Sequence, residues 1–376
     1  MDPQLVEKVL NLAMEIQQIP APTFAEGARA VFIRSCFQKE KLADVASDEV
    51  GNVYARLPGA GERLPVIISA HLDTVFPATT ELSLSRGVEK ISGPGIGDNA
   101  VGVAGMFGVL WAIRQSGKQL PGDLWLVANV CEEGLGDLRG MRAVVERFKQ
   151  APIAYIILEG MALGQIYHRG LGVRRYRITV RTPGGHSWVD HGQPSAVHVL
   201  ASLVTRLVEL PLPAEPRTTL NAGVISGGLS VNTIAAEAHL ELDLRSESAQ
   251  TLEDLVARVK ALIRETNQPD IRVTAEAIGQ RPVGEIPPEH PLVTLATRAL
   301  ETAGLKPCLN IGSTDANFPL SLGLPAICLG LTLGNGAHTL DEHIYTRPLA
   351  QGLSQLVSVV RGLYWQAPSS PHLLIP

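Results

Sequence analysis

Apolar and polar positions follow two different patterns along this chain, and the change comes near residue 171. Before it, residues 5–16 carry apolar side chains at the spacing of one helical face. Three later runs are almost wholly apolar, which is typical of strands buried on both faces of a parallel sheet. These runs are residues 66–70, 124–131 and 153–158. Residues 100–113 and 136–149 predict helices between them, so the first pattern indicates a mostly parallel α/β sheet.

The second pattern begins at residue 171 and is one of alternation. Two segments alternate between apolar and polar side chains, so each predicted strand has one buried face and one wet face, as in antiparallel sheets. Two amphipathic helices and two further strands complete the order β-α-β-β-α-β, the split βαβ arrangement of ferredoxin-like folds. In chain order the six predicted elements are residues 175–181, 196–208, 218–225, 236–245, 252–263 and 271–275.

The first pattern returns after three prolines between residues 282 and 288. The elements predicted there are residues 291–303, 326–329 and 348–365. We therefore predict an α/β protein of two domains. The larger is built from residues 1–170 and 287–376, and a smaller α/β domain is inserted over residues 171–286. Residues 367–376 are rich in Pro and Ser, which is typical of a frayed terminus.

Composition narrows the possible partners of this chain of 376 residues. Its hydrophobic fraction of 45% allows a large core, and its net charge of −5 comes without a basic stripe, so nucleic acid is not expected to bind. No apolar leader or long apolar stretch is evident, so we expect a cytoplasmic protein that does not contact a membrane. Four scattered cysteines without Cys-x-x-Cys spacing are expected to be buried, reduced thiols. They are Cys36, Cys131, Cys308 and Cys328.

Acidic and imidazole side chains follow each of the three apolar runs. Ligands of open α/β sheets bind outside the carboxyl ends of the strands, so these side chains are candidates for chemistry. The adjacent carboxylates Glu132 and Glu133 repel one another unless a cation is near. Two histidines and three carboxylates, with one carboxylate left over, would suit two zinc ions that share a bridging carboxylate. The candidates are His71, Asp98, Glu132, Glu133, Glu159 and His338.

Each candidate also has a simpler structural explanation. Asp98 precedes a predicted helix and could be its N-cap. Residues 95–100 fit the dinucleotide pattern G-x-G-x-x-A, but the core strand that should precede that pattern is missing. A metal-independent hydrolase would need a nucleophile, and no Gly-x-Ser-x-Gly motif is present. Cys131 lies beside two carboxylates, which would raise the pKa of its thiol and make it a poor nucleophile.

Six short motifs together resemble those of the M20 family of metallopeptidases. This family includes peptidase T-like enzymes, aminoacylases, succinyl-diaminopimelate desuccinylases and glutamate carboxypeptidases. The resemblance covers nearly the whole chain and implies a two-metal catalytic domain with an inserted lid or dimerisation domain. The motifs are Ser69-Ala70-His71-Leu72-Asp73-Thr74-Val75, Gly97-Asp98-Asn99, Glu132-Glu133-Gly134, Leu158-Glu159-Gly160, Gly184-Gly185-His186-Ser187 and Ala337-His338-Thr339.

The resemblance implies a role for each metal ligand. His71 and Glu159 would bind one metal ion, and Glu133 and His338 would bind the other. Asp98 would bridge the two ions and would be followed by a cis peptide bond. The ions would be divalent, with Zn²⁺ expected first and Mn²⁺ or Co²⁺ as alternatives.

The inserted domain is also implied to contribute to the site. His186 would stabilise the oxyanion, often from the partner subunit, although its motif could be only a turn. Asn232 would make a polar contact near the reacting carbonyl, or could be a turn residue. Arg245 would bind a substrate carboxylate, for which its fork of donors is suited, or could pair with a neighbouring acid. In the larger domain, Ser313 lies in a segment that resembles the substrate loop of the family.

The implied activity is hydrolysis of peptide bonds in short peptides by a metal-activated water. Glu132 would be the general base, and Asp73 would support His71. The alternative is an N-acyl-amino-acid amidohydrolase or carboxypeptidase that uses the same two-metal site. A non-catalytic binding protein is a further alternative, but such proteins are expected to lose a ligand or the base. The inserted domain is expected to form a homodimer.

Overall fold

The computed structural model describes residues 1–365 and divides the chain into two compact units. Unit 1 comprises Met1–Gly170 and the chain from Gly284 onward, and unit 2 is Leu171–Val283. The chain rejoins unit 1 at Gly284 because residues 284 and 285 pair with the strand that ends at Gly170. The terminus that the sequence predicts to fray, residues 367–376, lies outside the described residues.

Unit 1 is built on a nine-stranded sheet whose order is β1-β2-β6-β3-β7-β17-β8-β15, with β16 paired to β8. The four central strands, β6, β3, β7 and β17, run parallel, while β1, β2 and β15 pair antiparallel near the edges. The prediction of a mostly parallel sheet is therefore confirmed. The strands are β1 (Ala43–Ser47), β2 (Val53–Leu57), β3 (Arg63–His71), β6 (Gly122–Asn129), β7 (Ala154–Glu159), β8 (Gln165–Gly170), β15 (Gly284–Glu285), β16 (Cys308–Gly312) and β17 (Ala326–Gly330).

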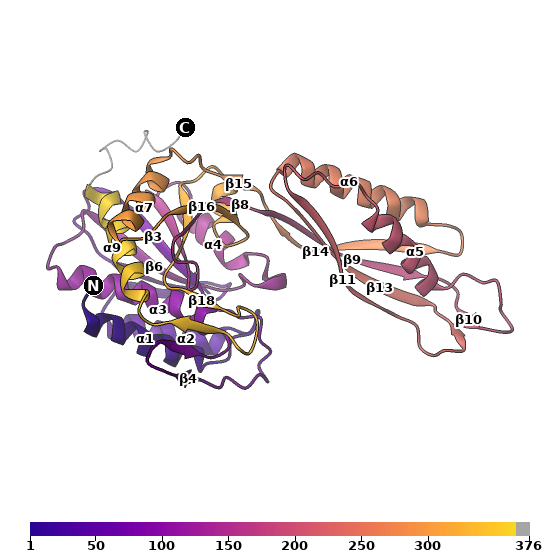
Figure 1. The fold of residues 1–376 in the computed structure, drawn as a ribbon, viewed down its shortest axis with the longest axis horizontal. Helices are drawn as coiled ribbons and strands as arrows, with labels where there is room; N and C mark the ends of the chain where they lie inside the picture. The colour runs from indigo at the N-terminus through magenta and orange to yellow at the C-terminus, as the bar shows by residue number, and fades with distance from the viewer. Residues whose placement is uncertain (366–376) are drawn as a thin grey trace. The chain divides into compact units, whose positions relative to one another are not determined.

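Helices from both parts of unit 1 pack on this sheet (Figure 1). The α1 helix has Asp2 as its N-cap and Pro3 at its first position, which suits a helix start. The α4 helix begins later than the pattern predicts, because Asp137 and Leu138 adopt positive φ angles of 58° and 57° that interrupt a helix. The helices are α1 (Pro3–Gln17), α2 (Gly27–Lys39), α3 (Val101–Gln115), α4 (Arg139–Phe148), α7 (Pro291–Thr302), α8 (Asn317–Ser321) and α9 (Leu349–Trp365).

The α3 helix lies in the core, where it contacts α1, α9, β3 and β7. Together with the preceding turn it forms the segment Ile96–Gln115, which is long and apolar enough to cross a membrane by composition alone. The expectation that the chain has no long apolar stretch is therefore wrong. Within the most apolar window, 83% of the residues are buried inside the protein, as in a helix that lies in the core of a large domain.

A small four-stranded sheet joins the two parts of unit 1, in the order β18-β19-β5-β4. It pairs β19, from the returning part, with β5, which precedes the segment that contains Asp98. The loop that carries His338 lies between β18 and β19, so this sheet brings His338 toward Asp98. The strands are β4 (Ser85–Arg86), β5 (Lys90–Ser92), β18 (Gly334–Asn335) and β19 (His343–Tyr345).

Unit 2 has the predicted β-α-β-β-α-β order, with an antiparallel sheet in the order β11-β13-β9-β14. The α5 and α6 helices cover one face of the sheet and form a hydrophobic core with it (Figure 1). Along β13 every second residue is buried, as its alternation predicts. The elements are β9 (Gly172–Arg181), β10 (Gly185–His186), α5 (Ala196–Val208), β11 (Thr218–Gly227), β12 (Thr233–Ile234), β13 (Glu237–Ser246), α6 (Ala249–Thr266) and β14 (Arg272–Arg281).

All four cysteines are free thiols, but not all are buried. Cys131 and Cys328 are buried, whereas Cys36 is half-buried and Cys308 is exposed. The prediction of four buried thiols is therefore wrong for Cys308 and only partly right for Cys36. Cys308 begins β16, a strand that pairs with β8 off the main strand order.

Candidate active site

Three neighbouring strands of unit 1 bring acidic and imidazole side chains to one edge of the sheet. His71 is the last residue of β3, and Glu159 is the last residue of β7. Asn129 ends β6 and pairs in register with His71, so the chain reaches Glu132 and Glu133 just beyond the same edge. The carboxyl ends of these parallel strands therefore meet where the sequence pattern places the candidate ligands.

Asp98 lies in the irregular turn Ile96–Ala100 that leads into α3. The peptide bond between Asp98 and Asn99 is cis, as the resemblance implies. This turn packs tightly on the end of β7, because a Cβ at Gly160 would collide with the carbonyl oxygen of Gly97. Glycine after Glu159 is therefore what lets Asp98 approach that strand end.

Glu342, which no motif of the sequence indicates, fixes the same turn. Its buried carboxylate accepts hydrogen bonds from three backbone N–H groups, those of Gly95, Gly97 and Asp98, at 2.9, 2.7 and 2.8 Å. Burial raises the pKa of Glu342 to about 7. Its partners are some 245 residues away along the chain, so no local pattern of residues indicates this contact.

The candidate ligands form two groups that share Asp98. Nε2 of His71 lies 3.1 Å from Oδ1 of Asp98 and 3.8 Å from Oε2 of Glu159. Nε2 of His338 lies 3.1 Å from Oδ2 of Asp98 and 3.2 Å from Oε1 of Glu133. Each carboxylate oxygen of Asp98 thus faces a different histidine, as a bridging ligand must.

These separations fit metal ions. Tetrahedral ligands at about 2.0–2.2 Å from zinc lie about 3.3–3.6 Å from one another. The measured donor separations, from 3.1 to 3.8 Å, are close to that range. Ligand atoms of His71, Asp98 and Glu133 also all lie within 4.8 Å of one another. Imidazole nitrogens and carboxylate oxygens are ligands that zinc and related divalent ions accept.

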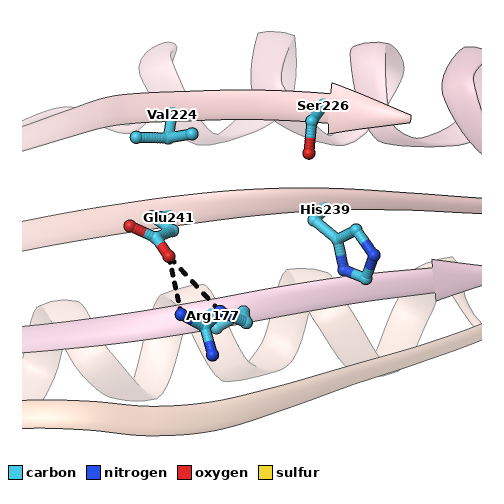
Figure 2. A pocket seen from close by; sticks show the side chains of 5 residues that line it. All are labelled: Arg177, Val224, Ser226, His239 and Glu241. Carbon is cyan, nitrogen blue, oxygen red and sulfur yellow. Dashed lines mark hydrogen bonds and ion pairs between the residues drawn. The ribbon is translucent and has the colours of Figure 1, made fainter.

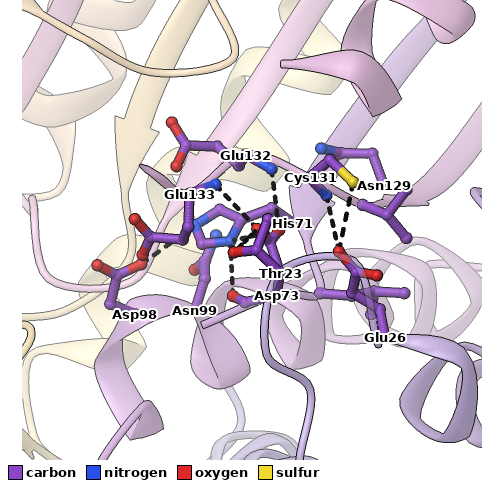
Figure 3. Close-up of polar contacts among 12 residues, drawn as sticks. Thr23, Glu26, His71, Asp73, Asp98, Asn99, Asn129, Cys131, Glu132 and Glu133 are labelled. Carbon is purple, nitrogen blue, oxygen red and sulfur yellow. Dashed lines mark hydrogen bonds and ion pairs between the residues drawn. The ribbon is translucent and has the colours of Figure 1, made fainter. Parts of the chain in front are cut away.

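Asp73 links His71 to the Glu132-Glu133 pair (Figure 3). Nδ1 of His71 lies 3.0 Å from the main-chain oxygen of Asp73, which can only accept, so Nδ1 carries a hydrogen and Nε2 faces Asp98 and Glu159. The Asp73 carboxylate lies 3.6 Å from Nδ1. It accepts the N–H of Glu132 at 3.0 Å, the N–H of Glu133 at 2.8 Å and the Thr23 hydroxyl at 3.0 Å.

The side chains of Glu132 and Glu133 have different surroundings. Figure 3 shows the Glu133 carboxylate turned toward Asp98, while the Glu132 carboxylate lies apart from it. Glu132 is only 5% exposed. The residue before it, Cys131, adopts a positive φ of 58°, a conformation that non-glycine residues adopt mainly at functional sites and turns.

Burial and mutual repulsion oppose the ionisation of some of these acids. Burial raises the pKa of Glu133 and that of Glu159 to about 7 each. Burial also acts against ionisation of Asp98, but its hydrogen bonds with His338 and His71 hold its pKa below the ordinary value. The bonds to Asp98 and Glu133 raise the pKa of His338 to about 10. A cluster of this kind favours added positive charge, which divalent cations would supply.

A second buried acid, Glu26, also supports the chain before Glu132, and the sequence analysis did not identify it. One of its carboxylate oxygens accepts the N–H of Phe24 at 3.0 Å and the N–H of Cys131 at 3.1 Å. Burial, followed by the charge of Glu26, raises the pKa of the Cys131 thiol to about 12. The thiol beside the cluster is therefore protonated at neutral pH and is a poor nucleophile.

Two of the predicted residues in unit 2, His186 and Asn232, lie at one end of its sheet. His186 pairs in register with Thr233, and the N–H of Ser187 donates to the main-chain oxygen of Asn232 at 3.1 Å. Nδ1 of His186 accepts the N–H groups of two following residues, at 3.2 and 3.3 Å. The neutral ring therefore carries its hydrogen on Nε2, which is exposed and able to donate.

Arg245 lies elsewhere in unit 2, paired in register with Val173 near the start of β9. Its Nε donates to Oδ1 of Asp243 at 2.7 Å, so the pairing with a neighbouring acid is the arrangement observed. Ser313 lies in unit 1 directly after β16, two residues before the buried Asp315.

A hollow on the open face of the unit 2 sheet holds none of the predicted residues (Figure 2). In it, Arg177 donates to Glu241 at 2.8 Å across β9 and β13. The pair is half-exposed, as expected for the wet face of an antiparallel sheet. Its lining residues are Arg177, Val224, Ser226, His239 and Glu241.

Comparison with known proteins agrees with this fold. A succinyl-diaminopimelate desuccinylase of Gluconacetobacter diazotrophicus is 26% identical over 362 residues, which cover 89% of this chain and 91% of that protein. The structure of a tripeptidase from Staphylococcus aureus is similar with a TM-score of 0.81 at 21% identity, covering 96% of this chain and 98% of that one. The structure of the aminopeptidase PepT from Bacillus cereus is similar with a TM-score of 0.77 at 22% identity, covering 95% of this chain and 98% of that one.

The match to a family extends over most of the chain. The sequence model of Peptidase family M20/M25/M40 matches residues 67–362, a span that contains all five candidate metal ligands and the whole of unit 2. These ligands come together at one sheet edge in the structure, and their types suit divalent cations. The chain therefore belongs to peptidase family M20/M25/M40, a family of metal-dependent hydrolases.

Proposed function

We propose that this protein hydrolyses peptide bonds in short peptides, with two divalent cations and with Glu132 as the general base. The observation that carries the proposal is the sharing of Asp98. Its two carboxylate oxygens each face a different histidine at 3.1 Å, and each histidine has a further carboxylate beside it. The family match makes the chain a hydrolase, and the donor set supports two cations rather than one.

The residues that would bind the cations follow from these two groups. His71 and Glu159 would bind one ion, Glu133 and His338 the other, and Asp98 would contact both. The ions, which we propose to be Zn²⁺, would supply a water of lowered pKa and polarise the substrate carbonyl.

The chain's own residues would then move the proton. Glu132 accepts the proton of the attacking water and returns it to the nitrogen of the leaving amine. Asp73 binds the N–H groups of Glu132 and Glu133, so it orients the base and a ligand together. His186 donates its Nε2–H to the oxyanion of the tetrahedral intermediate, which such donors typically stabilise by about 3–4 kcal/mol.

Three further residues are proposed to bind the substrate. Arg245 would bind a substrate carboxylate after exchanging its present partner, Asp243. Asn232 shares one tip of unit 2 with His186, which supports a role near the same carbonyl. Ser313 would contact the substrate from the loop after β16.

The alternative on the same site is cleavage of an N-acyl amino acid or release of a C-terminal residue. The similarity to a desuccinylase, which covers about nine tenths of both chains, favours keeping this alternative. Both reactions use the same water and base, so they differ in which end of the substrate is free.

A substrate panel assayed at several metal compositions tests the proposal. Dipeptides, tripeptides and N-acyl amino acids are incubated with enzyme loaded with zinc, manganese or cobalt, and with chelator-treated enzyme. We expect metal-dependent cleavage of the free peptides. Cleavage of only the N-acyl compounds would support the alternative, and turnover that survives complete metal removal would overturn both.

A further inference from the structure

Asp315 is a buried carboxyl group that the proposed reaction does not use. It lies between β16 and α8 in unit 1, and its exposed fraction is 0%. Nδ2 of Asn129 donates to Oδ2 of Asp315 at 2.6 Å. The two residues are 186 positions apart, so this bond ties the returning part of unit 1 to the end of β6.

The other oxygen of each side chain has no donor. Within residues 1–365, no protein group donates a hydrogen bond to Oδ1 of Asp315 or to Oδ1 of Asn129, and both atoms are buried. A buried polar atom without a partner is unfavourable, and native proteins contain few of them. Asp315 and Asn129, which are hydrogen-bonded to one another, each have one such oxygen, and this requires an explanation.

A single proton on Asp315 would provide partners for both of these buried oxygens. A protonated carboxyl group can donate from Oδ1 to the amide oxygen of Asn129, while the amide donates back to Oδ2. An ionised Asp315 would leave both oxygens unpaired and would add a further negative charge near those of Glu132 and Asp73. Burial, followed by the charge of Glu132, raises the pKa of Asp315 well above its ordinary value.

Asn129 lies where its hydrogen bonds with Asp315 can fix the positions of His71 and Glu132. It ends β6 and pairs in register with His71, and its main-chain oxygen accepts the N–H of Leu72 at 2.7 Å. The chain continues from Asn129 through two residues to Glu132. A fixed Asn129 side chain therefore fixes the strand ends from which a ligand and the base project.

We propose that Asp315 is a neutral carboxylic acid in the metal-loaded enzyme and that its paired hydrogen bonds with Asn129 make it a positioning residue for His71 and Glu132. The positioning role rests on the proposed function, whereas the protonation of Asp315 does not. One measurement therefore tests the protonation, and a second measurement tests the positioning role.

The first measurement is the infrared difference spectrum between the metal-loaded wild-type protein and the Asp315→Asn variant. We expect the wild-type protein to contribute the carbonyl stretch of a protonated carboxylic acid, unchanged across the neutral pH range and shifted in D₂O. A carboxylate band in its place would overturn the proposal. This spectrum needs no substrate, so it is informative whether or not the proposed hydrolysis is found.

The second measurement compares Asp315→Asn with Asp315→Leu on whichever substrate is cleaved. In the Asn variant, the two side-chain amides can form two hydrogen bonds with one another, as the acid and Asn129 do. We therefore expect its kcat, its metal content and the pH profile of kcat/KM to stay close to wild type. The Leu variant keeps the branching of the side chain but is larger and forms no hydrogen bonds, and we expect kcat or metal affinity to fall about 10–100-fold.

Equal losses in the two variants would overturn the proposal, because they would show that the enzyme needs the ionised acid. A shifted pH profile in Asp315→Asn would overturn it as well, since removing a neutral group changes no charge beside Glu132. The infrared spectrum and the Asn variant decide the question even if Asp315→Leu does not fold.

Discussion

At the scale of single residues, the surroundings of Glu132 and Glu133 favour different chemical roles for these two adjacent glutamates. Glu132 and Glu133 both donate their N–H groups to Asp73. The Glu133 carboxylate is 3.2 Å from His338, within a ligand group, whereas the Glu132 carboxylate lies apart from that group. We therefore expect the first to act on protons and the second to bind metal.

Glu132→Gln separates these two roles. The amide has the shape of the acid but cannot accept a proton from water, so we expect kcat to fall by at least about 10²–10⁴-fold with the metal content unchanged. Steady-state kinetics and elemental analysis of the same preparation provide the measurement. Glu133→Gln is the matched control and should lose metal. Normal turnover in Glu132→Gln would show that another group is the base.

Cysteine reactivity gives a second prediction at this scale. The pKa of Cys131 is raised to about 12, so its thiol stays protonated at any pH well below that value. Since iodoacetamide reacts with thiolates, we expect the native enzyme to be alkylated at the exposed Cys308, to leave Cys131 unmodified and to keep its activity. Peptide mass spectrometry checks the labelling, with denatured protein as the fully labelled control. Inactivation through Cys131 would revive a thiol mechanism.

At the scale of elements, the site depends on how closely a turn approaches a strand end. The turn that carries Asp98 lies against Gly160, directly after the end of β7, and a Cβ at Gly160 would collide with the Gly97 carbonyl oxygen. Glu342 anchors the same turn through three N–H groups. Neither contact involves a metal ligand side chain, yet both set where Asp98 lies.

Gly160→Ala tests that close approach. We expect the variant to lose about 1–3 kcal/mol of unfolding free energy, because backbone must shift to admit the methyl group. Metal affinity should fall with it, since Asp98 would move. Gly27→Ala is the matched control, because nothing lies within 4 Å of its added Cβ. Chemical denaturation and metal titration of both variants give the measurement, and equal behaviour would contradict the packing argument.

The elements also show what the sequence could predict. Strands β3, β6 and β7 were predictable because their apolar runs stop at charged residues, and this placed His71 and Glu159 correctly at strand ends. The short strands β1 and β2 carry no such run, and the sequence pattern assigned no element to them. The contacts of Glu342 and Asp315 were not predicted because their partners are distant in sequence and are backbone groups or a single amide.

At the scale of the whole molecule, two separate hydrophobic cores support the residues of the proposed reaction. The core of unit 1 includes residues of all the strands that carry proposed ligands, and unit 2 has its own core between its sheet and helices. The chain passes from one unit to the other at residues 170–171 and 283–284. His186 is thus supported by a core that Glu132 does not share.

Mixing two inactive variants tests whether His186 of one subunit acts at the site that contains Glu132 of the other subunit. If the protein is a dimer and His186 acts on the site of the partner, a dimer of Glu132→Gln with His186→Ala has one site with both residues intact. After subunit exchange of equal amounts, we expect roughly a quarter of wild-type activity, because half the dimers are mixed and each has one competent site of two. Each variant alone, treated identically, is the control. Native mass spectrometry, which separates the mixed dimer from the two parent dimers by mass, confirms that exchange has occurred. Mixed dimers without activity would mean that His186 serves its own subunit.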